Sequence, residues 1–328
     1  MQPFKYTRAA DAGAAVAAVF GSGDAKFIAG GTNLLDLMKE GVTNVSELVD
    51  IAGLNLTQIR STATGISLGA LAKNTDTANH PLVRRDYPLL TQAILAGASA
   101  QIRNMATNGG NLLQRTRCSY FYDVSMPCNK RKPGSGCGAI EGINRTHAIL
   151  GWSDKCVAVH PSDMAVALAA LNATVNVKGK DGGTRAIPFP AFHRLPGDTP
   201  EKDNTLEHGE LITSIEIPKN LFNRSYYLKV RDRASYAFAL ISVAVAMETK
   251  GGIINGEPRI AMGGVAHKPW RAMQAEKYLA GKKATEENFT AAASAEMAAA
   301  KPLEHNKFKV ELGKRAIVHA LMRATGIV

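Results

Sequence analysis

The sequence predicts an α+β protein with two structural regions. Its 328 residues are enough for two domains of ordinary size, and 45% hydrophobic with 20% charged residues is the composition of a globular chain. Short strand and helix patterns are mixed over the first part of the chain, whereas the last part reads as longer strands followed by helices. The boundary is expected between residues 180 and 225, and no internal repeat is present.

Hydrophobic periodicity defines the elements of the first region. An alanine-rich helix is expected near the start, and a strand at Lys26–Ala29 runs through a Gly-Gly turn into a helix that begins near Leu34. A further helix is predicted from a Ser162 or Asp163 cap to Ala170. The other expected elements are strands at Leu48–Ile51, Gly65–Leu71, Ala173–Val177 and Ile212–Ile217 and a helix at Leu89–Gly97.

The last part of the chain predicts a separate α+β unit. A strand pair, Ser235–Thr249 and Arg259–Val265, is joined near Gly251 and Gly252, which suit a tight turn. The polar, proline-flanked stretch 198–204 before this unit is expected to lie on the surface. Alanine-rich helices follow the strand pair at Ala272–Leu279, Phe289–Ala300 and Lys309–Met322.

Charge and hydropathy narrow the class of protein. Thirty-nine Lys and Arg against 28 Asp and Glu give a net charge of +11, so an anionic partner is expected: nucleic acid, an acidic protein or an anionic cofactor. The longest nearly apolar run, Ala237–Met247, is far shorter than the ~20 residues of a membrane-crossing helix, so no membrane span is expected. Asp11 and Gly13 break the apolar N-terminal stretch, so an export signal of its own is not expected.

All four cysteines lie in one segment that is rich in Gly, Pro, Asn and Ser and shows no sustained period: Cys118, Cys128, Cys137 and Cys156. The spacing lacks the close pairs typical of structural zinc, and disulfides are uncommon in a large chain without an export signal. Widely spaced thiolates suit a cubane cluster, although neither common ferredoxin pattern is matched. Seven Lys or Arg against three acids between 115 and 156 favour such an anionic group. On spacing alone, a cluster, disulfides or free thiols, and zinc all stay open.

Two diglycine loops have the residues of an anion cradle. In the first, a strand ends in Gly30-Gly31-Thr-Asn33 before a helix begins, and the second is the stretch Ala106–Leu113. Glycines let the backbone curve round an anion, Thr and Asn add hydrogen bonds, and a helix N-terminus adds its positive dipole end. Each loop alone could be a plain turn. Together they predict a long ligand with a polar middle, such as a dinucleotide, although the Rossmann and Walker A motifs are absent.

Four segments in order give the chain a family resemblance: FIAGGTNLL at 27–35, QIRNMATNGGNLLQRTRC at 101–118, HPSDMA at 160–165 and KVRDRASYAFALISVA at 229–244. Over most of its length the chain resembles the FAD-binding subunits of molybdenum hydroxylases of the xanthine oxidase family. Most members lack the four cysteines. Because this chain has the four cysteines, it most resembles the flavin subunits of bacterial periplasmic aldehyde oxidoreductases, in which such cysteines bind a 4Fe-4S cluster.

The resemblance implies a domain plan. Residues 1–220 would form a FAD-binding domain in two α/β parts, of the molybdopterin dehydrogenase type, with an iron–sulfur insert at about 115–160. Residues 221–328 would form an α+β domain of the CO dehydrogenase flavoprotein C-terminal type, with a three-stranded sheet and helices.

The resemblance also implies the contacts of a non-covalent FAD. The first loop would wrap its pyrophosphate and ribityl chain through Lys26, Phe27, Ile28, Ala29, Gly30, Gly31, Thr32, Asn33, Leu34 and Leu35. The second loop and the helix before it would add Gly97, Ala98, Ile102, Ala106, Thr107, Gly110, Asn111, Leu113 and Gln114. Asp163, Ile212 and Lys229 complete the set. Without the resemblance these three residues read as a helix cap, a core position and a solvated charge. The four cysteines would be the cluster ligands.

The implied activity is electron transfer within a heterotrimer. A large subunit with the molybdenum cofactor would oxidise an aldehyde with water to the carboxylic acid. A small subunit would relay electrons through 2Fe-2S clusters, and the FAD of this chain would pass them to an external acceptor other than NAD. No catalytic acid or base is expected here. The periplasm, reached by co-export with a partner, is the implied location, and the cytoplasm is the alternative.

Two other functions stay open. The same kind of flavin subunit could serve a hydroxylase of aromatic thioesters or purines, since the substrate pocket lies on another chain. The remote alternative is a basic nucleic-acid-binding protein with a structural metal site, motivated by the net charge and by Lys130-Arg-Lys132. It lacks aromatic interleaving near this basic run, so no nucleic-acid partner is expected.

Overall fold

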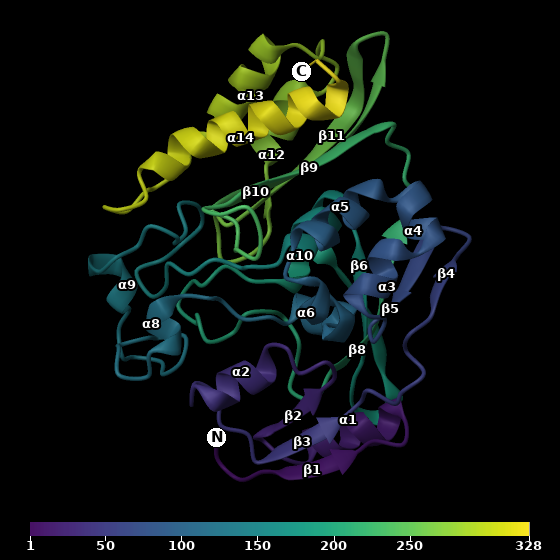
Figure 1. Cartoon of the computed structure of the whole chain (residues 1–328), viewed down its shortest axis with the longest axis vertical. Coiled ribbons are helices and arrows are strands. Elements are labelled where there is room, and N and C mark those ends of the chain that lie inside the picture. The colour runs from purple at the N-terminus through teal and green to yellow at the C-terminus, as the bar shows by residue number, and fades with distance from the viewer. Residues whose placement is uncertain (328) are drawn as a thin grey trace.

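The computed structural model describes residues 1–327 and begins with a three-stranded parallel sheet, coloured purple in Figure 1. Its order is β1-β3-β2, from β1 (Lys5–Arg8), β2 (Ala25–Ile28) and β3 (Glu47–Asp50). Helix α1 (Ala12–Phe20) starts where the Asp11 carboxylate accepts a hydrogen bond from the Ala14 N–H at 2.9 Å. Helix α2 (Leu34–Lys39) follows β2. The two helices were predicted, whereas β1, with only four residues, was not.

The second sheet is antiparallel and has the order β4-β5-β8-β6-β7. Helix α10 (Asp163–Ala170) lies in the core behind it and is buried at all positions because its sequence is almost entirely apolar. The strands are β4 (Ile59–Ser61), β5 (Gly65–Gly69), β6 (Thr174–Lys178), β7 (Thr184–Pro188) and β8 (Leu211–Pro218). The accompanying helices are α3 (Asn74–Asn79), α4 (Pro81–Asp86), α5 (Pro88–Ala96), α6 (Ala100–Met105), α7 (Asn108–Leu112), the 3-10 turn η1 (Lys180–Gly182) and α11 (Phe189–Phe192).

The C-terminal sheet has three long antiparallel strands, β9 (Arg224–Val230), β10 (Ile241–Lys250) and β11 (Ile253–Gly263). The expected three strands are therefore present, and the two-residue edge strand β12 (Trp270–Arg271) extends the sheet to four. The prediction of a strand from Ser235 was wrong. Residues 231–240 form a loop, in which Tyr236 has a φ of +50°, a conformation that a strand does not allow.

Both faces of this C-terminal sheet are covered. Along β10, Val243 and Val245 belong to one core with α12 (Met273–Leu279), α13 (Glu286–Met297) and α14 (Phe308–Thr325), which lie at the top of Figure 1, and α14 packs directly on β10. The alternate residues Ala244 and Ala246 face α10 of the N-terminal region. Because side chains of a strand alternate between faces, burial on both sides gives the nearly continuous apolar run in the sequence.

The cysteine segment has little regular structure. Between α7 and α10 the chain forms only two four-residue helices, α8 (Ser119–Tyr122) and α9 (Gly138–Glu141), in a lobe beside α2 and the C-terminal domain (Figure 1). A long loop was predicted here, and its one small core joins Phe121 and Cys128 to Leu37 of α2. No helix within residues 1–327 has the length and hydropathy of a membrane span.

Candidate functional site: a two-part cleft and a cysteine cavity

The first diglycine loop fits directly against the second. A Cβ atom on Gly30 would lie 2.0 Å from the carbonyl oxygen of Met105, so no other residue fits at this position without moving the backbone. Gly31 has a φ of +71°, in the left-handed region that favours glycine. The two glycines therefore bring the end of β2 into contact with the chain that leads into the second loop.

The second loop opens a short helix. Thr107 caps α7 by accepting a hydrogen bond from the Gly110 N–H at 3.2 Å, and Gly109 packs closely on Ala70 and Ile212. The two loops together line a cavity of about 760 Å³. The predicted site residues in its wall are Lys26, Phe27, Ile28, Ala29, Gly30, Gly31, Thr32, Asn33, Leu34, Thr107, Gly110, Leu113 and Ile212.

A second cavity, of about 550 Å³, adjoins the first. Thr32, Asn33 and Gly110 line both, so the two cavities share a wall at the diglycine loops. The other predicted site residues around the second cavity are Gly97, Ala98, Ile102, Ala106, Asn111, Gln114, Asp163 and Lys229. Leu35 is the only predicted contact in neither wall, and its side chain packs with Met38 and Val45 in a small core. The two-part shape suits a ligand with two large ends and a polar middle.

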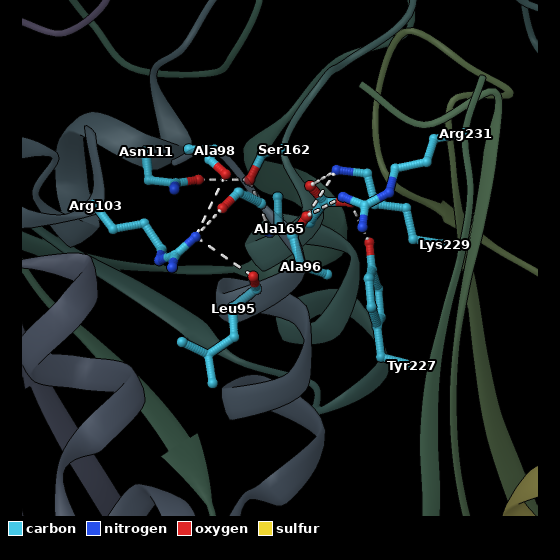
Figure 2. A network of polar contacts seen from close by, with 12 residues as sticks. Leu95, Ala96, Ala98, Arg103, Asn111, Ser162, Ala165, Tyr227, Lys229 and Arg231 are labelled. Carbon is cyan, nitrogen blue, oxygen red and sulfur yellow. Dashed lines mark hydrogen bonds and ion pairs between the residues drawn. The ribbon is translucent and has the colours of Figure 1, made fainter. Parts of the chain in front are cut away.

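Figure 2 shows a buried ion pair in the wall of the second cavity. Lys229 of β9 donates to the Asp163 carboxylate at 2.8 Å and to the carbonyl of Ala96 at 3.0 Å, and Tyr227 donates to the other carboxylate oxygen at 2.7 Å. The Lys229 and Asp163 side chains are only 5% and 8% exposed. Burial, reinforced by Asp163, raises the pKa of Tyr227 well above its ordinary value. Lys229 is thus not a solvated charge.

The opposite wall of this cavity is held by polar contacts to the backbone. Arg103 donates to the carbonyl oxygen of Gly97 at 2.7 Å and, at 3.4 Å, to those of Leu95 and Ala98 (Figure 2). Ala98 itself has a left-handed φ of +52°, which this bonding stabilises. The cap of α10 is Ser162, whose hydroxyl accepts from the Ala165 N–H at 3.0 Å. The alternative in which Asp163 acts as that cap was therefore wrong.

The four cysteines come together in the insert. Cys118, Cys128, Cys137 and Cys156 line one small cavity, none is in a disulfide, and Cys128 and Cys137 face each other as an antiparallel bridge pair. Burial raises the pKa of Cys118 to about 12 and that of Cys156 to about 11, so these thiols need a cationic group to become thiolates. Four sulfur donors in a buried cavity are the chemistry that an iron–sulfur cluster uses. Within residues 1–327, no three His, Cys, Asp or Glu side chains are close enough to hold a single metal ion.

A buried ionic network joins the insert to the cleft, and sequence reasoning missed it. Lys130, whose side chain is 1% exposed, donates to Asp203 at 2.5 Å and to the carbonyl of Pro200 at 2.7 Å. Arg115 donates to the same carboxylate at 2.6 Å, and its backbone N–H donates to Asn33 of the first loop at 2.9 Å. The prediction that 198–204 is a surface stretch was wrong for Pro200, which is buried, whereas the Asp203 side chain is 23% exposed. Although burial opposes it, Lys130 and Arg115 hold the pKa of Asp203 well below its usual range.

The buried histidines are neutral. Burial lowers the pKa of His147, His193 and His267 to about 4, and it lowers the pKa of His160 well below its ordinary value. His147 contacts a cysteine, with its Nε2 atom 3.1 Å from the Cys118 sulfur. Since no sequence pattern links residues 29 positions apart in a loop, this contact could only be found in the structure.

This cleft, formed by two diglycine loops in a mixed α and β domain, is found in a known family of redox proteins. Residues 2–220 match the family described as the FAD binding domain in molybdopterin dehydrogenase, and residues 226–325 match the CO dehydrogenase flavoprotein C-terminal domain. The chain belongs to the FAD-binding subunits of molybdenum hydroxylases, which are components of oxidoreductases.

Individual relatives extend this result. The chain is 50% identical over 302 residues to the aldehyde oxidoreductase FAD-binding subunit PaoB of Escherichia coli K12, covering 92% of this chain and 91% of that protein. It is 31% identical over 281 residues to the glyceraldehyde dehydrogenase medium chain of Sulfolobus acidocaldarius, covering 85% and 82%. Among solved structures, a chain of the carbon monoxide dehydrogenase from Hydrogenophaga pseudoflava superimposes with a TM-score of 0.78 at 26% identity, over 99% of both chains.

Proposed function

We propose that the protein is the FAD- and 4Fe-4S-containing electron-transfer subunit of a heterotrimeric molybdenum aldehyde oxidoreductase, which converts an aldehyde and water to the carboxylic acid. The observation that carries the proposal is the pair of diglycine loops that line two adjoining cavities. The 50% identical relative is named an aldehyde oxidoreductase subunit, which supports the choice of substrate class.

Within the cleft, the chain supplies binding and orientation. The backbone of Gly30 and Gly31 with the hydroxyl of Thr32 would hold the pyrophosphate where the cavities meet. Lys229 would present a cation to the flavin end, held in place by Asp163. FAD, when bound, accepts electrons singly from iron–sulfur partners and gives them up to an acceptor. The protein groups therefore need to bind and exclude solvent, and no acid or base is assigned.

In the insert, the four cysteines would ligate the cluster. Lys130, buried beside Cys156, supplies positive charge next to four thiolates, and the absence of a disulfide leaves all four sulfurs available. We propose a large subunit with the molybdenum cofactor and a small 2Fe-2S subunit as partners, and an acceptor other than NAD. A flavin subunit of a hydroxylase for aromatic thioesters or purines is the alternative, and the purine case is supported by a weaker match, the 25% identical putative xanthine dehydrogenase FAD-binding subunit XdhB of Escherichia coli K12.

The decisive experiment is an absorption spectrum of the co-expressed complex together with iron and acid-labile sulfide assays. The proposal predicts flavin bands and iron in excess of the partner 2Fe-2S clusters. Cys128→Ser should lose this excess iron and keep the flavin, whereas Ser125→Ala on the exposed part of the same insert should keep both. Oxidation of aromatic and aliphatic aldehydes, compared with purines and thioesters, then separates the substrate classes. A complex that releases no flavin on denaturation contradicts the FAD assignment, and a complex with flavin but no excess iron contradicts only the cluster.

We propose the periplasm as the location, reached by co-export with a partner that carries the targeting signal. Fractionation of cells with and without the partner subunits tests this. Periplasmic recovery only in the presence of the partners supports co-export. Recovery in the cytoplasm in both strains contradicts it, as does recovery in the periplasm without partners.

A further inference from the structure

We propose that His147 donates a hydrogen bond to the Cys118 thiolate and thereby raises the reduction potential of the cluster on the side that faces the cofactor cleft. This inference rests on the proposed cluster ligation by the four cysteines. It makes His147 a positioning residue for a redox group, a role that no sequence motif indicates.

The contact has the geometry and the polarity of such a bond. The Nε2 atom of His147 lies 3.1 Å from the Cys118 sulfur. A thiolate can only accept a hydrogen bond, so Nε2 of His147 must carry a proton and donate it to the sulfur when Cys118 binds a metal. The other ring nitrogen, Nδ1, is buried and has no hydrogen-bond partner among residues 1–327. The imidazole therefore has one polar contact, and that contact is the cysteine.

The C-terminal domain fixes this ring in place. Lys309 and Asn306, at the start of α14, donate to the backbone carbonyl oxygen of His147 at 2.8 and 3.3 Å. The backbone N–H of His147 donates to the carbonyl of Asn144 at 3.0 Å, and the Tyr120 ring lies 6.2 Å away, centroid to centroid. Because the backbone of His147 is bonded on both sides, the base of its side chain is fixed beside the cysteine, and turning the buried imidazole away would break its hydrogen bond to Cys118.

Cys118 holds a distinct position among the four cysteines. It lines both the cysteine cavity and the second cavity of the cleft, whereas the other three line only the cysteine cavity. His147 also lines that second cavity. The Cys118–His147 pair is thus part of the wall between the two redox sites. A donor on a ligand sulfur stabilises the reduced, more negative cluster, so the potential rises.

Two variants of the intact complex test the role. His147→Leu removes the donor, and His147→Gln keeps an N–H group at the end of a side chain of similar length. In a redox titration followed by EPR, the midpoint potential of the 4Fe-4S signal should fall in His147→Leu and return toward the wild-type value in His147→Gln. His319→Leu, an exposed position of α14, is the matched control and should leave the potential unchanged. An unchanged potential in His147→Leu, with iron retained, overturns the inference.

A measurement on the wild-type complex covers the case in which the leucine variant loses its cluster. Labelling histidine with ¹⁵N should give a nitrogen coupling to the reduced cluster in pulsed EPR, and His147→Gln should abolish it. A wild-type cluster with no histidine nitrogen coupling overturns the inference while the cluster assignment stands. A wild-type complex with no 4Fe-4S signal at all overturns the cluster assignment and the inference with it.

Discussion

The cofactor cleft and the cysteine insert are held together in different ways. The cleft is made by backbone: glycines at the ends of regular elements let two loops meet, and sheets on either side fix them. The insert has only two four-residue helices and is held by side chains that bond to backbone, as when Arg131 donates to the Phe121 carbonyl at 2.7 Å. The comparison teaches that a packed framework positions the cleft, whereas the insert depends on a few polar side chains and on what its cysteines bind.

The largest effect is expected from the buried cation of the insert. Lys130→Met removes the two hydrogen bonds of this buried cation, to Asp203 and to the carbonyl of Pro200, and at about 1.5 kcal/mol for each the free energy of unfolding should fall by about 3 kcal/mol. Urea unfolding of the complex, followed by flavin fluorescence and by the visible iron–sulfur bands, should show the bands lost before the flavin. Lys132→Met, an exposed neighbour, should match the wild type. Simultaneous loss of both signals would show that the two regions are not distinct.

The cleft should instead be sensitive to a single methyl group. Gly30→Ala places a Cβ against the Met105 carbonyl and forces the two loops apart, at a cost of about 2 kcal/mol or more. FAD content after gel filtration should drop at least tenfold while iron stays bound. Gly23→Ala, which has open space around its Cβ, is the control and should keep its FAD. A Gly30→Ala complex with full FAD would contradict the backbone account of the cleft.

A smaller effect is expected where the two domains meet at the cleft. Tyr227→Phe removes the hydroxyl that donates to Asp163 at 2.7 Å, and a hydrogen bond to a charged group is worth about 1.5 kcal/mol. The dissociation constant for FAD, from fluorescence quenching, should rise about tenfold, since 1.4 kcal/mol is a factor of ten. Tyr226→Phe, on the other face of β9, should leave it unchanged.

The smallest effect is a change in acid sensitivity. The pKa of Asp203 is lowered in the folded protein, so its ion pairs add stability above the ordinary pKa of 3.8, and that stability is lost as the pH falls below it. Asn cannot bind the proton that Asp203 takes up on acid unfolding. In Asp203→Asn the free energy of unfolding should therefore fall less steeply between pH 5 and pH 3, by up to about 1.4 kcal/mol per pH unit. Equal slopes for variant and wild type would show that Asp203 has the same pKa in the folded and the unfolded protein.

The sequence predicted most of the cleft because its elements are local. Periodicity located β2, α2 and α10, and all predicted cofactor contacts except Leu35 lie in the walls of the two cavities. Their roles toward FAD stay predictions. In the insert, only the cysteines could be predicted from the sequence. The Lys130–Asp203 pair could not, because it joins residues 73 positions apart in chain segments without periodicity.

The two errors in the C-terminal region arise where the apolar pattern of the sequence does not match the strand. Strand β9 was missed because its charged and aromatic residues, RSYYLKV, show no clear apolar period. Strand β10 was extended too far toward the N-terminus because the loop before it, with Tyr236 and Phe238, is itself apolar.

The C-terminal sheet, one face of which covers α10, also affects how the chain folds during its synthesis. On the ribosome, α10 is synthesised long before β10 and β11, whose alanines cover it. Until roughly the last hundred residues emerge, this almost entirely apolar helix has no partner on that side, and newly made chains need protection from aggregation. Cells that make the protein in quantity should therefore yield more of it at low temperature or with extra chaperone, and a chain stopped after β8 should be insoluble.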